Sequence, residues 1–175
     1  MTPSNPDETA ALAPRRLILM RHAKSDWSNA GLSDHDRPLN RRGQRDAPRM
    51  AGWLGSIDCW PDKVLCSSAV RTCETLELLK DEFETDPVIC FSNLLYCATA
   101  ATILDVIRSE SGEARTLLLI AHNPGISELA SHFSDQFIGM STAAMVVFET
   151  SISQWGQLQA NSPMTMIHNM RPKAL

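Results

Sequence analysis

The stretch Leu17-Ile18-Leu19-Met20-Arg21-His22 decides how the rest of the chain is interpreted. Four consecutive apolar residues bounded by polar ones are typical of a buried strand in a parallel sheet. In open α/β sheets, ligands bind just beyond the carboxyl ends of the strands. Arg21 and His22 end this predicted strand, so they stand where a binding or catalytic site is expected.

Further apolar runs predict strands of the same kind, and the segments between them predict helices. The predicted strands are 63–67, 88–91 and 116–121, and the predicted helices are 40–56, 69–82, 99–109 and 126–133. Asn40, Ser67-Ser68 and Thr99 are the residue types that cap helix N-termini, and each is expected to begin the helix that follows it. Strands that alternate with helices indicate an open parallel sheet covered by helices on both faces.

The two ends of the chain have different patterns. Residues 143–149 and 156–161 predict two strands joined by a short loop, and the residues after Pro163 are expected to form an extended or frayed tail. Residues 1–14 contain no Lys or Arg and predict a flexible tail rather than a signal or transit peptide. The expected fold is α/β, a three-layer α/β/α sandwich in one domain over residues 15–175. Its open sheet should be mostly parallel, with one antiparallel strand near the C-terminus.

The composition indicates an ordinary soluble protein. The chain has 175 residues, of which 43% are hydrophobic and 21% charged, enough for one domain with a full core. A net charge of −4 argues against nucleic acid and gives no reason to expect a membrane partner. Five cysteines without a CxxC pair indicate reduced thiols and a cytoplasmic protein. We expect a monomer.

Basic residues follow three of the predicted strands. Arg21 and His22 end the first strand, Arg71 lies one turn into the helix after the second, and His122 follows the most apolar strand. The carboxyl ends of parallel strands meet at one edge, so these four side chains should converge. A guanidinium group can bind two phosphate oxygens at once, and an imidazole can act as a nucleophile or an acid. The pattern therefore predicts a pocket for a phosphoryl group.

Four motifs in this order resemble the landmarks of the histidine phosphatase superfamily, which has the phosphoglycerate mutase-like fold. They are LILMRHAKSDW (17–27), LSDHDRPLNRRGQRDA (32–47), LCSSAVRTCETLELL (65–79) and LLLIAHNPGISELA (117–130). The resemblance spans residues 16–161 and is strongest to the short branch typified by SixA phosphohistidine phosphatase. The superfamily usually has Arg-His-Gly where this chain has Arg-His-Ala.

The resemblance implies a role for each of the converging residues. His22 would be the nucleophile and would become a transient phosphohistidine, while Arg21, Arg71 and His122 would hold the phosphoryl oxygens. His122 would also stabilise charge in the transition state. The residues implied in phosphate or substrate binding are Ser25, Ser28 and Asn123. We expect neither a cofactor nor a metal ion.

A general acid is missing where larger relatives have one. Those relatives place a glutamate after the third strand, and here residues 93–97 read Asn-Leu-Leu-Tyr-Cys. An alkoxide leaving group needs a proton, whereas imidazole leaving from phosphohistidine needs less help. The expected substrate is therefore phosphohistidine on a protein, with a small-molecule phosphomonoesterase as the alternative. The candidate proton donors are Asp26, Asp34, His35, Asp36 and Glu74.

Other functions of the same residues are less favoured. Cys66 and Arg71 are separated by four residues rather than the five of a cysteine phosphatase loop, so Cys66 is expected in the core. The histidines have no HxH or HExxH metal-ligand spacing, and the arginines would repel a cation. A non-catalytic phosphate-binding module is a further alternative, although all four core groups are present. A mutase is disfavoured because short loops exclude water poorly.

Overall fold

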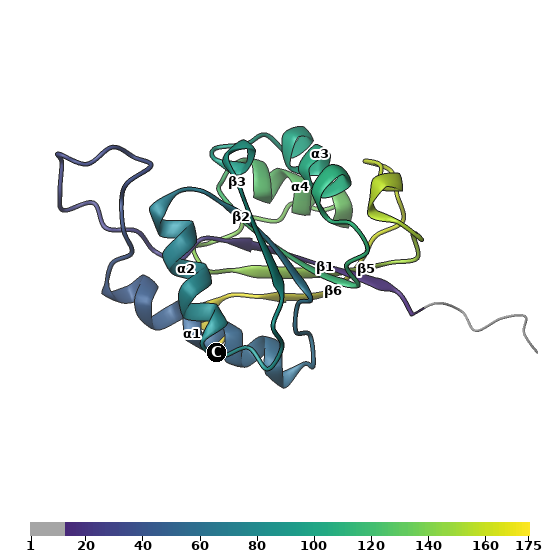
Figure 1. The fold of residues 1–175 in the computed structure, drawn as a ribbon, viewed down its shortest axis with the longest axis horizontal. Coiled ribbons are helices and arrows are strands. Elements are labelled where there is room, and N and C mark those ends of the chain that lie inside the picture. The colour runs from purple at the N-terminus through teal and green to yellow at the C-terminus, as the bar shows by residue number, and fades with distance from the viewer. Residues whose placement is uncertain (1–12) are drawn as a thin grey trace, which may run out of the picture.

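The computed structural model describes residues 13–175 (Figure 1). Residues 1–12, where most of the expected N-terminal tail falls, lie outside the described residues. The strands are β1 (Arg15–Arg21), β2 (Lys63–Ser67), β3 (Val88–Ser92), β4 (Thr116–Ala121), β5 (Met145–Thr150) and β6 (Thr165–Met170). The helices are α1 (Arg41–Ser56), α2 (Val70–Lys80), α3 (Ala100–Glu110) and α4 (Gly125–Ser134), with short 3₁₀ turns η1 (Asn93–Leu95), η2 (Trp155–Gln157) and η3 (Pro172–Ala174).

One six-stranded sheet forms the centre of the molecule. Its strand order is β3-β2-β4-β1-β5-β6, and the pairs β2–β3, β2–β4 and β1–β4 are parallel. β5 is antiparallel to both of its neighbours, so β6 runs in the same direction as β1. A single strand, β5, therefore opposes the rest, and the predicted mostly parallel sheet with one antiparallel strand is confirmed.

β1 is buried on both faces, as its uninterrupted apolar run predicts. Leu17 and Leu19 pack in the core cluster shared with α3 and α4, while Ile18 and Met20 pack in the cluster shared with α1 and α2. All four side chains have no exposed surface. Figure 1 shows the two helix pairs on opposite faces of the sheet, which gives the three predicted layers.

The C-terminal strand is not where the sequence pattern placed it. Residues 156–161 form η2 and a turn, and β6 lies at Thr165–Met170, within the segment expected to be a frayed tail. Trp155 explains the difference, because it is fully buried and donates a hydrogen bond of 2.7 Å to the Ala114 carbonyl. This anchor makes the segment after β5 a packed connection, and the chain then returns to pair with β5.

The predicted helix caps are confirmed at two of three positions. The side chain of Asn40 accepts a hydrogen bond from the Gly43 amide, and that of Thr99 accepts one from the Thr102 amide. The prediction for Ser67-Ser68 is wrong, because α2 begins after Ala69, with no side-chain cap. The Ser67 hydroxyl instead contacts a histidine at the sheet edge, as described below.

None of the helices between residues 13 and 175 has the length and apolar character needed to cross a membrane.

Candidate active site

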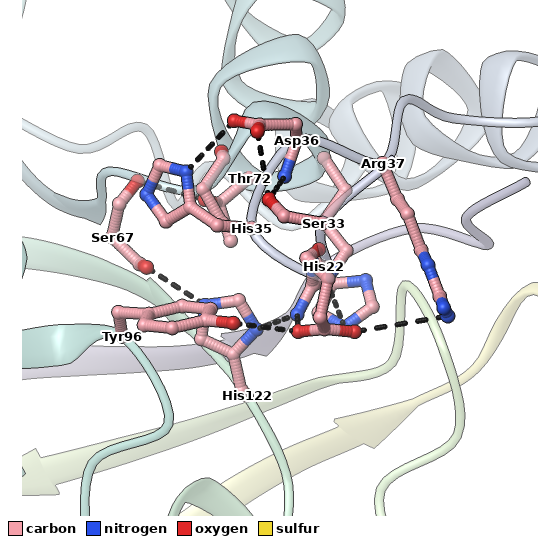
Figure 2. A network of polar contacts seen from close by, with 12 residues as sticks. His22, Ser33, His35, Asp36, Arg37, Ser67, Thr72, Tyr96 and His122 are labelled. Carbon is pink, nitrogen blue, oxygen red and sulfur yellow. Dashed lines mark hydrogen bonds and ion pairs between the residues drawn. The ribbon is translucent and has the colours of Figure 1, made fainter. Parts of the chain in front are cut away.

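The carboxyl ends of β1, β2 and β4 surround a pocket of about 260 Å³ at one edge of the sheet. Its lining residues are Arg21, His22, Lys24, Ser25, Trp27, Asp34, Arg71, Cys97, His122, Asn123 and Thr142. The structure therefore brings together the two arginines and two histidines that the strand ends predict. Figure 2 shows His22 and His122 close to one another beneath the polar network.

His22 is held as a neutral imidazole with one unprotonated nitrogen. It is 7% exposed, and its Nδ1 lies 2.7 Å from the Ala23 carbonyl oxygen, so Nδ1 carries the proton. Its Nε2 then presents a lone pair, which faces Arg71 Nε at 3.4 Å. The pKa of His22 is lowered to about 4, mainly by burial and also by the charges of Arg71 and Arg21, while the hydrogen bond to Ala23 opposes this shift. Near neutral pH this side chain is therefore uncharged.

Two guanidinium groups make the pocket strongly attractive to anions. Arg71 is 5% exposed, and its Nη2 donates to Asp34 Oδ2 at 2.9 Å and to His122 Nδ1 at 3.3 Å. Arg21 donates from Nη1 to the Met140 carbonyl at 3.0 Å, while its Nε is buried without a hydrogen-bond partner among residues 13–175. Burial and the charge of Arg71 lower the pKa of Arg21. A phosphoryl dianion would relieve this repulsion.

His122 is the second buried imidazole. It is 3% exposed, and its ring centroid lies 5.1 Å from that of His22. Because Arg71 only donates, the Nδ1 of His122 accepts, and its Nε2–H donates to Ser67 Oγ at 2.7 Å. Burial, followed by the proximity of His22 and Arg71, lowers the pKa of His122 to about 3. Ser67 thus fixes the orientation of a ring that borders the phosphoryl position.

Tyr96 and Asp34 form a contact that the sequence analysis missed. Tyr96 follows η1, its hydroxyl donates to Asp34 Oδ2 at 2.7 Å, and its ring meets His122 edge-on with centroids 5.5 Å apart (Figure 2). This hydrogen bond is the main reason that the pKa of Tyr96 rises to about 12 and that the pKa of Asp34 falls. Tyr96 is the only tyrosine in the chain and follows a parallel strand, a signal that could have identified it.

The segment that carries Tyr96 packs closely against the start of α4. A Cβ atom at Gly125 would lie 2.0 Å from the Ala98 carbonyl oxygen, a separation that no side chain can adopt. Glycine at this position therefore lets the loop after η1 approach the helix that follows His122. The approach brings the Tyr96 ring to His122.

Two of the three residues predicted to bind substrate line the pocket, and the third does not. Ser25 and Asn123 line the pocket, and Asn123 Nδ2 donates to the Met140 carbonyl at 3.0 Å. Ser28 is exposed and lies outside the lining, and its backbone amide donates to Asp26 Oδ1 at 2.7 Å. Ser25 and Asn123 are therefore close enough to contact a ligand bound at the strand ends.

Only one of the three main candidate proton donors lies in the pocket. Asp34 lines it, with its carboxylate on Arg71 and Tyr96. Asp36 is exposed, accepts from Ser33 Oγ at 2.7 Å and lies outside the lining. Glu74 accepts from the Leu39 amide at 2.6 Å and lines a separate cavity of about 430 Å³.

The structure also bears on two alternative sites, a cysteine nucleophile and a metal centre. Cys66 has no exposed surface and lies in the core that faces α1 and α2, as predicted. The neighbouring Cys73 and burial hold the pKa of the Cys66 thiol well above its usual value, so this thiol is a poor nucleophile. Within residues 13–175, no three His, Cys, Asp or Glu side chains gather in an arrangement that could hold a metal ion.

Comparisons with known proteins agree with this geometry. Residues 17–94 match the family model described as the histidine phosphatase superfamily (branch 1). An uncharacterised chloroplastic protein of Arabidopsis thaliana is 32% identical over 157 residues, which cover 85% of this chain and 72% of the relative. The structure of a proposed phosphohistidine phosphatase SixA from Nakamurella multipartitia matches with a TM-score of 0.79 and 26% identity, over 91% of this chain and 96% of that one. The structure of a protein histidine phosphatase SixA complexed with tungstate, at 22% identity, shares the fold with a TM-score of 0.74, over 91% and 98%.

Proposed function

Because this chain belongs to the histidine phosphatase superfamily, we propose that it hydrolyses phosphohistidine on a protein through a covalent intermediate on His22. The observation that carries the proposal is the neutral His22, whose unprotonated Nε2 faces Arg71 in the cationic pocket. The similarity to the Nakamurella protein, itself a proposed phosphohistidine phosphatase, supports the same substrate class.

The first step exchanges one phosphorus–nitrogen bond for another. The Nε2 lone pair of His22 attacks phosphorus, and the bond from phosphorus to the substrate imidazole breaks with its electron pair going to that nitrogen. The substrate ring leaves as neutral imidazole because the proton on its second nitrogen stays in place. Since both partners are imidazoles, the exchange is close to thermoneutral and needs no general acid.

Arg21, Arg71 and His122 would stabilise the phosphoryl group during this transfer. Each guanidinium group can bind two of its oxygens at once. Because the protein already holds these groups in position, they need no reorganisation during the transfer. A phosphoryl dianion beside His122 raises the pKa of that ring, so Nδ1 takes up a proton from solvent and then donates a hydrogen bond to a phosphoryl oxygen. Ser67 holds the ring in the required orientation through Nε2.

The second step releases inorganic phosphate. Water adds to phosphorus, the bond to His22 Nε2 breaks, and both water protons leave with the phosphate as the dihydrogen anion. His22 returns to its neutral form with its proton on Nδ1, which donates a hydrogen bond to the Ala23 carbonyl. The hydrogen bond to Ala23 therefore serves both steps, since it keeps Nε2 unprotonated before the attack and after the release.

A small-molecule phosphomonoesterase is the second candidate, and the pocket volume favours it. A space of about 260 Å³ admits a phosphate ester of modest size. However, an alkoxide needs a proton, and the groups near the pocket supply one poorly. Tyr96 holds its proton to a pKa of about 12, and the pKa of Asp34 lies below its usual value. Alkyl esters should therefore be slow substrates.

A substrate panel tests the proposal. Purified protein is assayed with a phosphohistidine peptide, phosphotyrosine, p-nitrophenyl phosphate and a sugar phosphate, with His22→Ala as the control. We expect the highest kcat/KM for the phosphohistidine peptide and a phosphoenzyme that survives alkaline quenching and is absent in the variant. Faster hydrolysis of the sugar phosphate would overturn the substrate assignment. Binding of the phosphopeptide without turnover would identify a binding module instead.

A further inference from the structure

A carboxylate lies in a pocket otherwise suited to an anion. Asp34 lines the space between Arg71 and His122, and 45% of its side chain is exposed to solvent. Its negative charge opposes the entry of a phosphoryl dianion, because like charges in a partly desolvated site repel strongly. This repulsion weakens the binding of a phosphoryl substrate unless another part of that substrate makes a favourable contact with Asp34.

The contacts of Asp34 leave one carboxylate oxygen available. Oδ2 accepts from the Tyr96 hydroxyl at 2.7 Å and from Arg71 Nη2 at 2.9 Å. Oδ1 lies 3.8 Å from Arg37 Nη1, which is beyond hydrogen-bond length. Arg37 itself stacks on the exposed Trp27 ring, with its Cζ atom 3.6 Å from the centroid. Within residues 13–175, Oδ1 therefore accepts no hydrogen bond, while Oδ2 is held by Tyr96 and Arg71 and the residue lines the pocket.

Resting on the proposed function, we propose that Asp34 determines specificity by accepting a hydrogen bond from the free ring N–H of the phosphorylated imidazolium, which then leaves as neutral imidazole. This contact would select substrates whose leaving group is a protonated nitrogen heterocycle. The repulsion between Asp34 and the phosphoryl group is then offset, because the cationic ring lies between the two anions. An alkyl or aryl phosphate brings no such cation and keeps the repulsion.

The contact also increases the reactivity of the bound substrate. Phosphohistidine leaves as neutral imidazole only when its second ring nitrogen carries a proton. A carboxylate at that nitrogen stabilises the protonated ring, so the reactive form persists to higher pH. No proton is transferred from Asp34 in this step: the P–N bond breaks, its electron pair returns to the ring, and the ring keeps the proton that Asp34 holds in place.

The charged and titratable groups around Asp34 allow this role. Arg71 faces it from α2, Arg37 from its own loop and Tyr96 from the turn after β3. His22 and His122 face it from the ends of β1 and β4. The pKa of His22 is lowered to about 4 and that of His122 to about 3. Among residues 13–175, Asp34 is thus the one acidic side chain that lines this pocket, among cations and neutral rings.

Asp34→Asn tests the inference by comparing two substrates in one variant. For the phosphohistidine peptide we expect kcat to fall on the order of 10- to 100-fold, the range for losing a charge-assisted hydrogen bond. The decline of kcat at alkaline pH should also begin at lower pH than in the wild type. For p-nitrophenyl phosphate, whose leaving group needs no proton, kcat/KM should stay level or rise, and the alkaline limb of its pH profile should not move.

Two further variants separate this role from a structural one. Asp34→Glu keeps the charge and should restore most of the preference for phosphohistidine and its alkaline limb. Asp81→Asn removes one exposed charge beyond the end of α2, away from the pocket, and should change neither substrate. Equal losses on both substrates in Asp34→Asn, or an unchanged alkaline limb, would overturn the inference and leave the proposed function intact. A wild-type protein inactive on the phosphohistidine peptide would overturn the proposed function, and the inference with it.

Discussion

The floor and the rim of the pocket are built in different ways. The floor consists of Arg21, His22, Arg71 and His122, which stand at or just beyond the carboxyl ends of three adjacent strands. The rim is the loop 24–39, which includes Asp34 and the 65% exposed Trp27. Floor groups are fixed by the sheet and, under the proposed function, would contact the phosphoryl group, whichever substrate brings it. Rim groups face the part of the substrate that departs, so the floor sets the reaction and the rim sets the substrate.

The largest expected effect falls on the floor, at His22. His22→Ala removes the nucleophile, and kcat should drop about 10⁴-fold or more on both the phosphohistidine peptide and p-nitrophenyl phosphate. His132→Ala is the matched control, since that exposed histidine on α4 contacts the Ala160 carbonyl rather than the pocket. Steady-state kinetics on both proteins measure the difference. A loss confined to one substrate would contradict the division between floor and rim.

Arg71→Lys should give the next largest effect. Lysine keeps the charge but loses the planar fork that reaches His22, His122 and Asp34 together, so kcat/KM should fall roughly 10²- to 10³-fold. Both substrates should suffer alike, because the guanidinium fork would bind the phosphoryl oxygens that both substrates share. Arg45→Lys, on an exposed turn of α1, provides the control for the substitution itself. Retained activity in Arg71→Lys would show that charge alone suffices.

The convergence of the floor was predictable from the sequence because it follows from strand ends. Apolar runs mark the strands, and Arg21, His22 and His122 end or directly follow two of them. The parallel arrangement then forces these residues to one edge without any knowledge of loops. The helix that carries Arg71 was placed correctly for the same reason, even though its expected serine cap was wrong.

The rim was not predictable, because its contacts depend on how loops fold. Tyr96 and Asp34 are 62 positions apart and belong to two connections without regular periodicity. The predicted list of proton donors contained Asp34 but gave no means to separate it from Asp36 or Glu74. β6 was misplaced for a related reason: it is a half-exposed edge strand, and its mixed residues show no clear alternation.

The protonation state of the floor should set the acid limit of activity. The pKa of His22 is lowered to about 4, so the nucleophile stays neutral down to that pH, whereas an exposed histidine would protonate near 6.5. For p-nitrophenyl phosphate, kcat/KM corrected for substrate ionisation should be level between about pH 7 and 5. Below about pH 4 it should fall roughly tenfold per pH unit, because protonated Nε2 has no lone pair. A fall centred near pH 6.5 would mean that His22 is far more solvated than the structure shows.

The smallest expected effect lies at the outer rim, at Trp27. Its ring supports the Arg37 guanidinium at 3.6 Å and borders the pocket mouth, where residues flanking a phosphohistidine would pass. Trp27→Ala should raise KM for a phosphohistidine protein about two- to fivefold, the range for losing an exposed cation–π contact, with kcat unchanged. p-Nitrophenyl phosphate is too short to reach beyond the mouth, so its kcat/KM should not change. Trp27→Phe, which keeps an aromatic face beneath Arg37, should restore most of the affinity. An equal change for both substrates would place Trp27 with the floor and show that the rim also shapes the phosphoryl site.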